Sequence, residues 1–352
     1  MNDLISIVVP VYKAEAFISN LIDDVLAQTY QNWELILVSN GPNREKQEDI
    51  CRQYAFTDKR IKLYVNDRAG TSIARNRGIE NAIGKWLTFL DVDDRIAPTH
   101  LIKYLDAVED DVDIVIGGFT EYSISGKKTV YKMERHDTAT DEYVFYDYLL
   151  SCHVSLQGVA WNKFYRADVF SNSGIRFHED VVHIEDVVLN YEMYLYCRRI
   201  KTIPMTGYKY IRYSDSTTGR YTPSFEKSFG VLGTLYIEIC KLAGYSENKI
   251  KQILLRRKYI ETYICVINLF RLDCPLPFGR KVKEVESLLN NNEFNSSKSI
   301  VDTQENKLNL KIFNFFVKMQ SPLLMSIGYT ILFRVKGCLD LLKKKLCSKN
   351  RS

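Results

Sequence analysis

The stretch Trp86-Leu87-Thr88-Phe89-Leu90-Asp91-Val92-Asp93-Asp94 decides the fold class, because a five-residue apolar run ends in three carboxylates within four positions. Such a run with aromatic side chains is typical of a strand covered on both faces. In open α/β sheets, ligands bind just beyond the carboxyl ends of these strands. Carboxylates there suit Mg²⁺ or Mn²⁺, hard cations that prefer oxygen ligands. The alternative is a solvated acidic turn, since Asp is common in turns.

Outward from this stretch, apolar runs alternate with helical patterns between residues 4 and 117. The expected strands are Leu4–Val9, Leu35–Val38, Ile61–Val65, Trp86–Leu90 and Val112–Ile116, and the expected helices are 14–28, 43–56, 71–83 and 98–109. This βαβα order predicts an α/β fold with a Rossmann-like, mostly parallel sheet and helices on both faces.

The rest of the chain changes character in steps. Residues 118–133 predict a hairpin that turns at Ser125-Gly126, and further short strands are expected in Trp161–Tyr165 and Ile200–Tyr213. Beyond about residue 222 the pattern is helical, and an Asn- and Ser-rich stretch indicates a linker or exposed loop. We therefore expect an α/β domain with a helical C-terminal extension, divided as 1–222 (halves 1–117 and 118–222), 223–290, linker 291–307 and C-terminal helices 308–352.

Cysteine and charge patterns narrow the class of protein. Eight cysteines form no CxxC pair, and no secretory leader precedes the first strand, so we expect a reducing cytosol and no structural zinc. Residues 334–352 hold seven Lys and Arg against one acidic residue, Asp340. Their net charge of +6 exceeds the +5 of the whole chain. The remainder is close to neutral, so a nucleic-acid-binding surface is not expected.

The basic C-terminus also has a helical apolar pattern. Residues at helical spacing are Leu324, Ile327, Ile331, Val335, Leu339, Leu342 and Leu346. The uncharged run 319–333 has 15 residues, whereas roughly 20 are needed to span a bilayer. An interfacial amphipathic helix is therefore favoured over a transmembrane one. The alternative is a helix docked on the domain with a solvated basic end.

Several motifs occur in an order that resembles the inverting family 2 glycosyltransferases with the GT-A fold, bacterial enzymes that assemble surface polysaccharides. The resemblance covers roughly residues 4–216. The matching segments are Val8–Tyr12, Gln28–Leu35, Gly70–Gly78 with its Ala-Arg-Asn-x-Gly helix, the DxD segment Phe89–Asp94, Trp161–Arg166, Ile175–Phe177 and Glu185-Asp186. Each motif is weak alone, and the ordered set is strong. The resemblance makes 1–117 the nucleotide-binding half and 118–222 the acceptor-side half.

The resemblance implies specific roles for the acidic residues. Asp93 and Asp94 would hold Mn²⁺ or Mg²⁺, which neutralises charge on the leaving diphosphate. Asp91 would touch the ribose or the metal-bound water, although the sequence does not rank the three. Asp186 would take the proton from the attacking hydroxyl as general base, and Glu185 would orient Asp186 or the acceptor. The alternative for this pair is an acidic first helical turn, favoured by the helix dipole.

Donor recognition is implied at the ends of the first two strands, by Pro10, Tyr12 and Glu15 and by Asn40. Here the sequence departs from the family, because Ser39-Asn40-Gly41 replaces the usual Asp-Asp-Gly. An Asn oxygen still accepts a hydrogen bond from uracil N3–H, but its amide can equally donate to cytosine N3. UDP is therefore the favoured nucleotide, without being secured.

Three arginines complete the implied donor site. Arg68 stands where the family usually has Asn, and Arg68 and Arg75 would contact the diphosphate or the base. Arg212 lies in a segment that resembles a family loop closing over the diphosphate. The alternatives are ordinary surface arginines and, for the region around Arg212, a flexible polar loop.

These observations together predict an inverting hexosyl- or N-acetylhexosaminyltransferase. It would move a sugar from a nucleotide diphosphate donor to a glycan or a polyprenyl-diphosphate-linked acceptor in surface polysaccharide synthesis. We expect it in the cytoplasm, held by its C-terminus at the anionic inner face of the membrane, with a homo-oligomer left open. One alternative is a sugar nucleotidyltransferase, although Pro10–Lys13 is not its Gly-rich phosphate loop. The other is a non-catalytic scaffold, suggested by Ser39 and Asn40.

Overall fold

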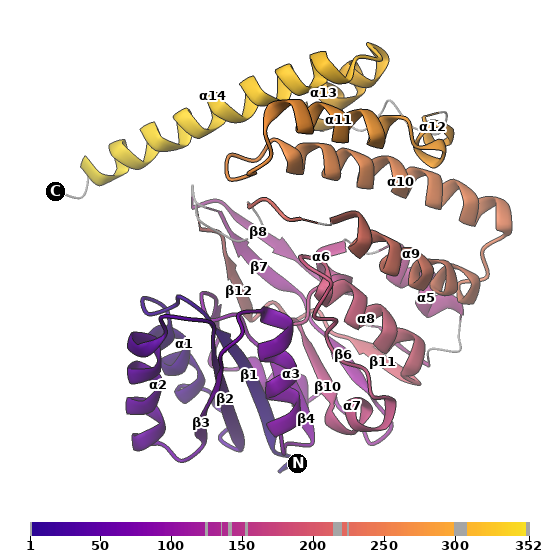
Figure 1. The fold of residues 1–352 in the computed structure, drawn as a ribbon. Coiled ribbons are helices and arrows are strands. Elements are labelled where there is room, and N and C mark those ends of the chain that lie inside the picture. The colour runs from indigo at the N-terminus through magenta and orange to yellow at the C-terminus, as the bar shows by residue number, and fades with distance from the viewer. Residues whose placement is uncertain are drawn as a thin grey trace. The chain divides into compact units, whose positions relative to one another are not determined.

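The computed structural model describes residues 2–123, 126–134, 136–139, 143–151, 154–213, 220–223, 225–298 and 308–349 (Figure 1). The chain forms two compact units. The first comprises residues 1–214 and 234–244, and the second comprises residues 215–233 and 245–352. Each unit is described on its own below.

The first unit is built on the predicted parallel strands. They pair in the order β3-β2-β1-β4, with β1 at Ile5–Val11, β2 at Trp33–Asn40, β3 at Ile61–Asn66 and β4 at Trp86–Phe89. Every residue of β2 and β4 is buried, as expected for continuous apolar runs covered on both faces. The helices along the chain between and after these strands are α1 (Ile18–Leu26), α2 (Glu45–Thr57), α3 (Thr71–Asn81) and α4 (His100–Leu105). The predicted α/β architecture with a largely parallel core is confirmed.

The same sheet continues beyond β4 with shorter strands. Strand β10 (Lys163–Arg166) runs antiparallel between β4 and β6 (Ile114–Ile116), and then β11 (Arg199–Thr202) and β9 (His136–Ala139) follow. The helices of this half are α5 (Tyr143–Ser151), α6 (Val154–Gly158), α7 (Ala167–Ser173) and α8 (Glu185–Tyr196). The antiparallel β10 matters for the site, because it places its first residue, Lys163, next to the end of β4.

A second, four-stranded sheet has the order β5-β12-β7-β8. Its strands are β5 (Arg95–Ile96), β12 (Tyr208–Ile211), β7 (Phe119–Tyr122) and β8 (Lys128–Tyr131). The predicted hairpin is confirmed, because β7 and β8 pair antiparallel. Part of its predicted turn, Ser125, lies outside the described residues. Because β12 pairs with β5 directly after the acidic stretch, this small sheet closes against the end of β4.

Helix α3 packs unusually closely on the parallel sheet at Gly78. A Cβ atom built on Gly78 would lie 2.1 Å from Cγ1 of Val8 in β1. Any larger side chain would therefore push α3 away from the strand. This approach fixes the depth at which the preceding turn of α3 presents Arg75.

The second unit is helical, as the sequence predicts beyond about residue 222. Its helices are α10 (Glu247–Leu269), α11 (Phe278–Leu289), α12 (Asn292–Ser297), α13 (Leu308–Lys318) and α14 (Pro322–Lys349), while α9 (Phe225–Leu242) contributes to both units. Its core includes the fully buried side chains of Val266, Val285, Phe294, Phe313 and Met325. The unit therefore has a hydrophobic core of its own.

The predicted linker over 291–307 is wrong in its first part. Asn291 accepts hydrogen bonds from the backbone N–H groups of Glu293 and Phe294 and begins helix α12. The Phe294 ring stacks on Tyr259 with centroids 5.3 Å apart. An N-cap and one buried aromatic residue outweigh a polar composition, because they supply both a helix start and a packing anchor. Residues 299–307 lie outside the described residues.

Helix α14 leaves an apolar surface exposed. Met325 and Tyr329 face the core, whereas other apolar residues of the helix are 39–58% exposed, namely Leu323, Leu324, Ile327, Ile331, Leu332 and Val335. We call these six residues the α14 apolar face. Among the described residues, no helix is long and apolar enough to cross a bilayer.

Candidate active site

The carboxyl ends of β1 and β2 are joined to the start of α3 by Asn40. Its Nδ2 donates to the Val11 carbonyl at 3.1 Å, and its Oδ1 accepts from the Gly70 N–H at 3.1 Å. Asn40 is only 2% exposed. The amide therefore fastens two strand ends to the helix that carries Arg75, and a contact between Asn40 and the base stays a prediction.

The other predicted donor residues of β1 lie at an open rim. Tyr12 is 41% exposed and packs on Gly41, where a Cβ would lie 2.7 Å from the Tyr12 ring. Gly41 has φ +81°, a left-handed conformation that favours glycine. Pro10 is partly exposed and Glu15 is exposed. A flat aromatic ring at an open strand end is suited to stacking on a nucleobase.

Asp94 is the most buried of the three carboxylates after β4. It is 1% exposed, Oδ2 accepts from the Tyr208 hydroxyl at 2.7 Å, and Oδ1 accepts from the Ile211 N–H at 2.8 Å. Burial, with the negative charges of Asp91 and Asp93, raises its pKa well above the ordinary value. Both oxygens of Asp94 therefore hold β12 against the acidic turn.

Asp91 and Asp93 remain partly exposed beside it. Burial, followed by the charge of Asp91, raises the pKa of Asp93 to about 6. A divalent cation would offset this repulsion, so this pair of oxygen donors fits Mn²⁺ or Mg²⁺. Among the described residues, no group of three or more His, Cys, Asp or Glu side chains is arranged to hold a metal ion.

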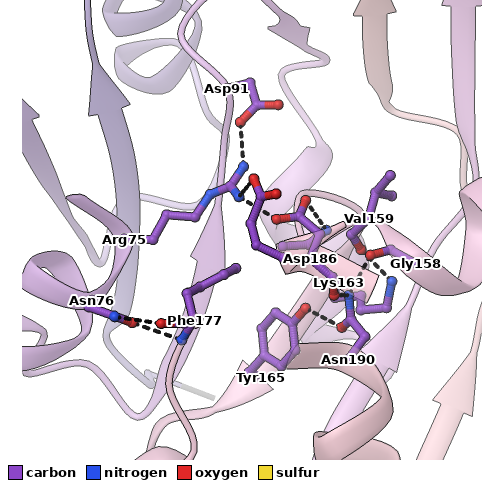
Figure 2. Close-up of polar contacts among 12 residues, drawn as sticks. Arg75, Asn76, Asp91, Gly158, Val159, Lys163, Tyr165, Phe177, Asp186 and Asn190 are labelled. Carbon is purple, nitrogen blue, oxygen red and sulfur yellow. Dashed lines mark hydrogen bonds and ion pairs between the residues drawn. The ribbon is translucent and has the colours of Figure 1, made fainter. Parts of the chain in front are cut away.

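Arg75 is the centre of the site (Figure 2). Its side chain is 3% exposed, and its guanidinium pairs with Asp91 at 2.9 Å, with Asp186, and with Glu185 at 3.7 Å. Burial opposes the charge, but the three carboxylates outweigh it and raise the pKa of Arg75 above its ordinary value. A guanidinium group suits this position, because it is permanently charged and its planar set of N–H donors binds several oxygens at fixed angles. Arg75 thereby joins the acidic turn after β4 to the first turn of α8.

Asp186 and Glu185 begin α8, as predicted, and the fold brings them to Arg75. Oδ2 of Asp186 accepts from the Ala160 N–H at 3.1 Å. Burial raises the pKa of Asp186, although Arg75 opposes the shift. Burial and the neighbouring charge of Asp186 raise the pKa of Glu185 to about 7. Paired carboxyl groups with raised pKa values are suited to general acid–base chemistry.

Two predicted donor residues lie away from this cluster. Arg68 is 75% exposed and pairs with Glu179 at 3.1 Å. Arg212 is 54% exposed and pairs with Glu121 at 2.8 Å, directly after β12. The structure therefore brings together Arg75, Asp91, Glu185 and Asp186, and it leaves both of these arginines on the surface. Their diphosphate contacts stay predictions.

Some residues that build the site escape sequence reasoning. Tyr208 holds Asp94, and the Ala160 N–H holds Asp186, without any local signal for either contact. Asn76 of the Ala-Arg-Asn motif forms two 2.9 Å hydrogen bonds with the backbone of Phe177. This bond pair fastens α3 to the segment before α8. The motif marks Asn76 but does not reveal this partner.

The chain is similar to several known glycosyltransferases. The model of "Glycosyl transferase family 2" matches residues 6–172. "Putative glycosyltransferase EpsH" of Bacillus subtilis is 26% identical over 275 residues, which are 75% of this chain and 76% of that protein. "Putative teichuronic acid biosynthesis glycosyltransferase TuaG" of B. subtilis is 35% identical over 104 residues, 29% of this chain and 41% of TuaG. The crystal structure of S. aureus TarS 1-349 in complex with UDP-GlcNAc has a TM-score of 0.63 and 17% identity over 94% of this chain and 92% of TarS.

Proposed function

This chain belongs to glycosyl transferase family 2 with a GT-A fold of the bacterial polysaccharide type, and we propose that it transfers a sugar from a UDP-sugar to a glycan hydroxyl with inversion. The observation that carries this proposal is the ion-pair cluster of Arg75 with Asp91 and Asp186. It joins a carboxylate at the donor end of the sheet to a candidate base on α8. The bound UDP-GlcNAc of TarS supports UDP as the nucleotide, and the name of TuaG supports a surface-polymer acceptor.

In the proposed reaction Asp186 is the general base. Its carboxylate takes the proton of the acceptor hydroxyl as that oxygen bonds to the anomeric carbon. The bond from this carbon to the donor diphosphate breaks in the same displacement, and UDP leaves. A single displacement inverts the anomeric centre. The partial exposure of Asp186 and its fixed contacts to Arg75 and Ala160 support this role.

We assign metal binding primarily to Asp93, with Asp91 beside it. When bound, Mn²⁺ or Mg²⁺ would neutralise charge on the leaving diphosphate. Asp94, which the sequence pairs with Asp93 at the metal, has both oxygens engaged by Tyr208 and Ile211. Its proposed contribution is to keep the acidic turn in place.

The remaining donor contacts are proposed from the strand ends. Tyr12 would stack on the base, with Pro10 and Glu15 nearby and Asn40 at the end of β2. Arg68 and Arg212 lie on the surface, so they would reach the diphosphate only by exchanging their present partners Glu179 and Glu121. The donor sugar would be a hexose or an N-acetylhexosamine.

Replacing Asp186 by Asn tests the proposal. We expect UDP release from UDP-glucose and UDP-N-acetylglucosamine to fall about 10²- to 10⁴-fold, with donor KM retained. Asp168→Asn is the matched control, because Asp168 is a 55% exposed residue of α7. Wild-type turnover in Asp186→Asn would show that Asp186 is not the base, and an absence of turnover in the wild type would favour the scaffold alternative.

We also propose that the C-terminus holds the enzyme at an anionic membrane on the cytoplasmic side. The exposed α14 apolar face supports this, because it runs into the sequence cluster of basic residues that begins at Arg334. Each Lys or Arg near such a surface contributes about 1 kcal/mol. A lipid-linked acceptor, such as a polyprenyl diphosphate glycan, would lie at the same surface.

A further inference from the structure

A lysine without solvent contact lies beneath the candidate base. Lys163 is the first residue of β10 and is 0% exposed. Its Nζ donates to the Leu156 carbonyl at 3.2 Å, to Asn162 Oδ1 at 2.8 Å and to the Val159 carbonyl. Three acceptors match the three N–H donors of an ammonium group, whereas a neutral amine has only two. Burying an ammonium group is costly unless it is fully hydrogen-bonded, and these three acceptors meet that requirement.

The acceptors of Lys163 belong to the segment that supports Asp186. Helix α6 ends at Gly158, and Val159 leads from it to Ala160. We call residues 156–160 the turn 156–160. The Ala160 N–H is the donor to Oδ2 of Asp186. By binding two carbonyls of this turn, Lys163 sets the position of the peptide that carries that N–H. Burial lowers the pKa of Lys163 well below its ordinary value, and the negative charge of Asp186 opposes this shift.

A second anchor holds the same turn from α8. Asn190 donates to the Gly158 carbonyl at 2.8 Å and to the Asp186 carbonyl at 2.7 Å. Its Oδ1 accepts from the Tyr165 hydroxyl at 2.7 Å. Tyr165 lies two positions after Lys163, so both residues are on one face of β10. Figure 2 shows these groups gathered behind Asp186, on the side away from Asp91.

We propose that Lys163 is a positioning residue for sugar transfer, which holds the turn 156–160 so that the Ala160 N–H fixes the carboxylate of Asp186. This inference rests on the proposed role of Asp186 as general base. Because Lys163 is 0% exposed, it would touch neither donor nor acceptor. It acts on turnover through Ala160, because a base displaced by a fraction of an ångström loses its alignment with the hydroxyl.

Lys163→Met tests this role, because it removes the ammonium and keeps a chain of similar length. The matched control is Lys201→Met, which removes another buried lysine of the same sheet, 8% exposed and paired with Glu109 in the fold. Kinetics are measured at a temperature where both variants are folded by circular dichroism. We expect Lys163→Met to lower kcat about 100-fold with donor KM unchanged. Lys201→Met should lose stability but keep kcat.

Equal kcat losses in the two lysine variants, or wild-type kcat in Lys163→Met, would overturn the inference. If Lys163→Met does not fold, Tyr165→Phe replaces it, because it deletes only the hydroxyl that holds Asn190. Tyr165→Phe should then lower kcat about 10-fold at unchanged donor KM, and wild-type kcat would overturn the inference. Asp186→Asn separates the two proposals. If it is inactive while Lys163→Met is fully active, only the role of Lys163 fails.

Discussion

Arg75 and Asp186 lie 111 positions apart in the sequence and form an ion pair in the fold. The same guanidinium reaches Asp91 at 2.9 Å. Burial raises the pKa of Asp186, and Arg75 opposes this shift by favouring the ionised carboxylate. Arg75 also makes the base weaker, because an ion pair stabilises the carboxylate. The two effects oppose each other in setting the pKa of Asp186, and burial outweighs the ion pair.

Arg75→Lys should therefore change the pH dependence of turnover. A lysine cannot bind several carboxylates as a planar fork, so the pKa of Asp186 should rise and the acidic limb of the kcat profile should move to higher pH. We expect kcat at neutral pH to fall about 10- to 100-fold. Arg77→Lys is the control, because Arg77 is a 46% exposed residue of the same helix. An unmoved acidic limb in Arg75→Lys would contradict this account.

Glu185→Gln should stabilise the protein at alkaline pH. The folded-state pKa of Glu185 is about 7, above an unfolded value of about 4.3, so the native state binds more protons between these values. Stability from this group is therefore lost as pH rises through that window. By urea unfolding, Glu185→Gln should exceed wild type by about 1–3 kcal/mol at pH 8, and the difference should narrow toward about pH 5.

The control for this effect is Glu80→Gln, since Glu80 is 53% exposed on α3. Its stability difference from wild type should stay constant over the same pH range. A constant stability difference for Glu185→Gln as well would show that the pKa of Glu185 is not raised in the folded state.

Thermal shifts should separate the roles of Asp93 and Asp94. Ligands that bind only the folded state raise its stability, so a panel of UDP, GDP, CDP and dTDP with and without Mn²⁺ should give a Mn²⁺-dependent shift with UDP. Asp93→Ala should lose that shift. Asp94→Asn should instead lower stability without ligand by about 1–3 kcal/mol, because the Asn amide has one acceptor oxygen and cannot accept from both Tyr208 and Ile211. A full Mn²⁺-dependent shift in Asp93→Ala would refute the metal assignment.

The α14 apolar face should govern vesicle binding. Ile331 is 58% exposed, and Ile331→Glu should weaken flotation with phosphatidylglycerol vesicles about 10-fold, the loss of roughly 1.5 kcal/mol of apolar burial. Phe56→Glu is the control, because Phe56 is 92% exposed on α2. Deleting 321–352 should abolish the binding. Unchanged vesicle binding in either C-terminal variant would contradict the membrane proposal. If that variant also forms a smaller particle than the wild type by light scattering, the α14 apolar face mediates self-association instead.

Local sequence patterns determined the scaffold of this protein. Apolar runs specify β1, β2 and β4 because a strand covered on both faces needs apolar side chains along its length. Parallel strands place their carboxyl ends at one edge. The order of the motifs therefore located Asp91, Asp93 and the first turn of α8. The exception is α12, where one buried ring, Phe294, outweighs a polar composition.

Only the tertiary structure decided which polar groups meet. Arg75 pairs with Asp186, Tyr208 donates to Asp94, and the Ala160 N–H donates to Asp186, and each contact joins residues far apart in the sequence. A sequence reveals that a residue is acidic or basic, and near which strand end it lies. Which buried charge finds which partner is fixed by the packing of helices on the sheet, because an unpaired charge there is too costly to leave.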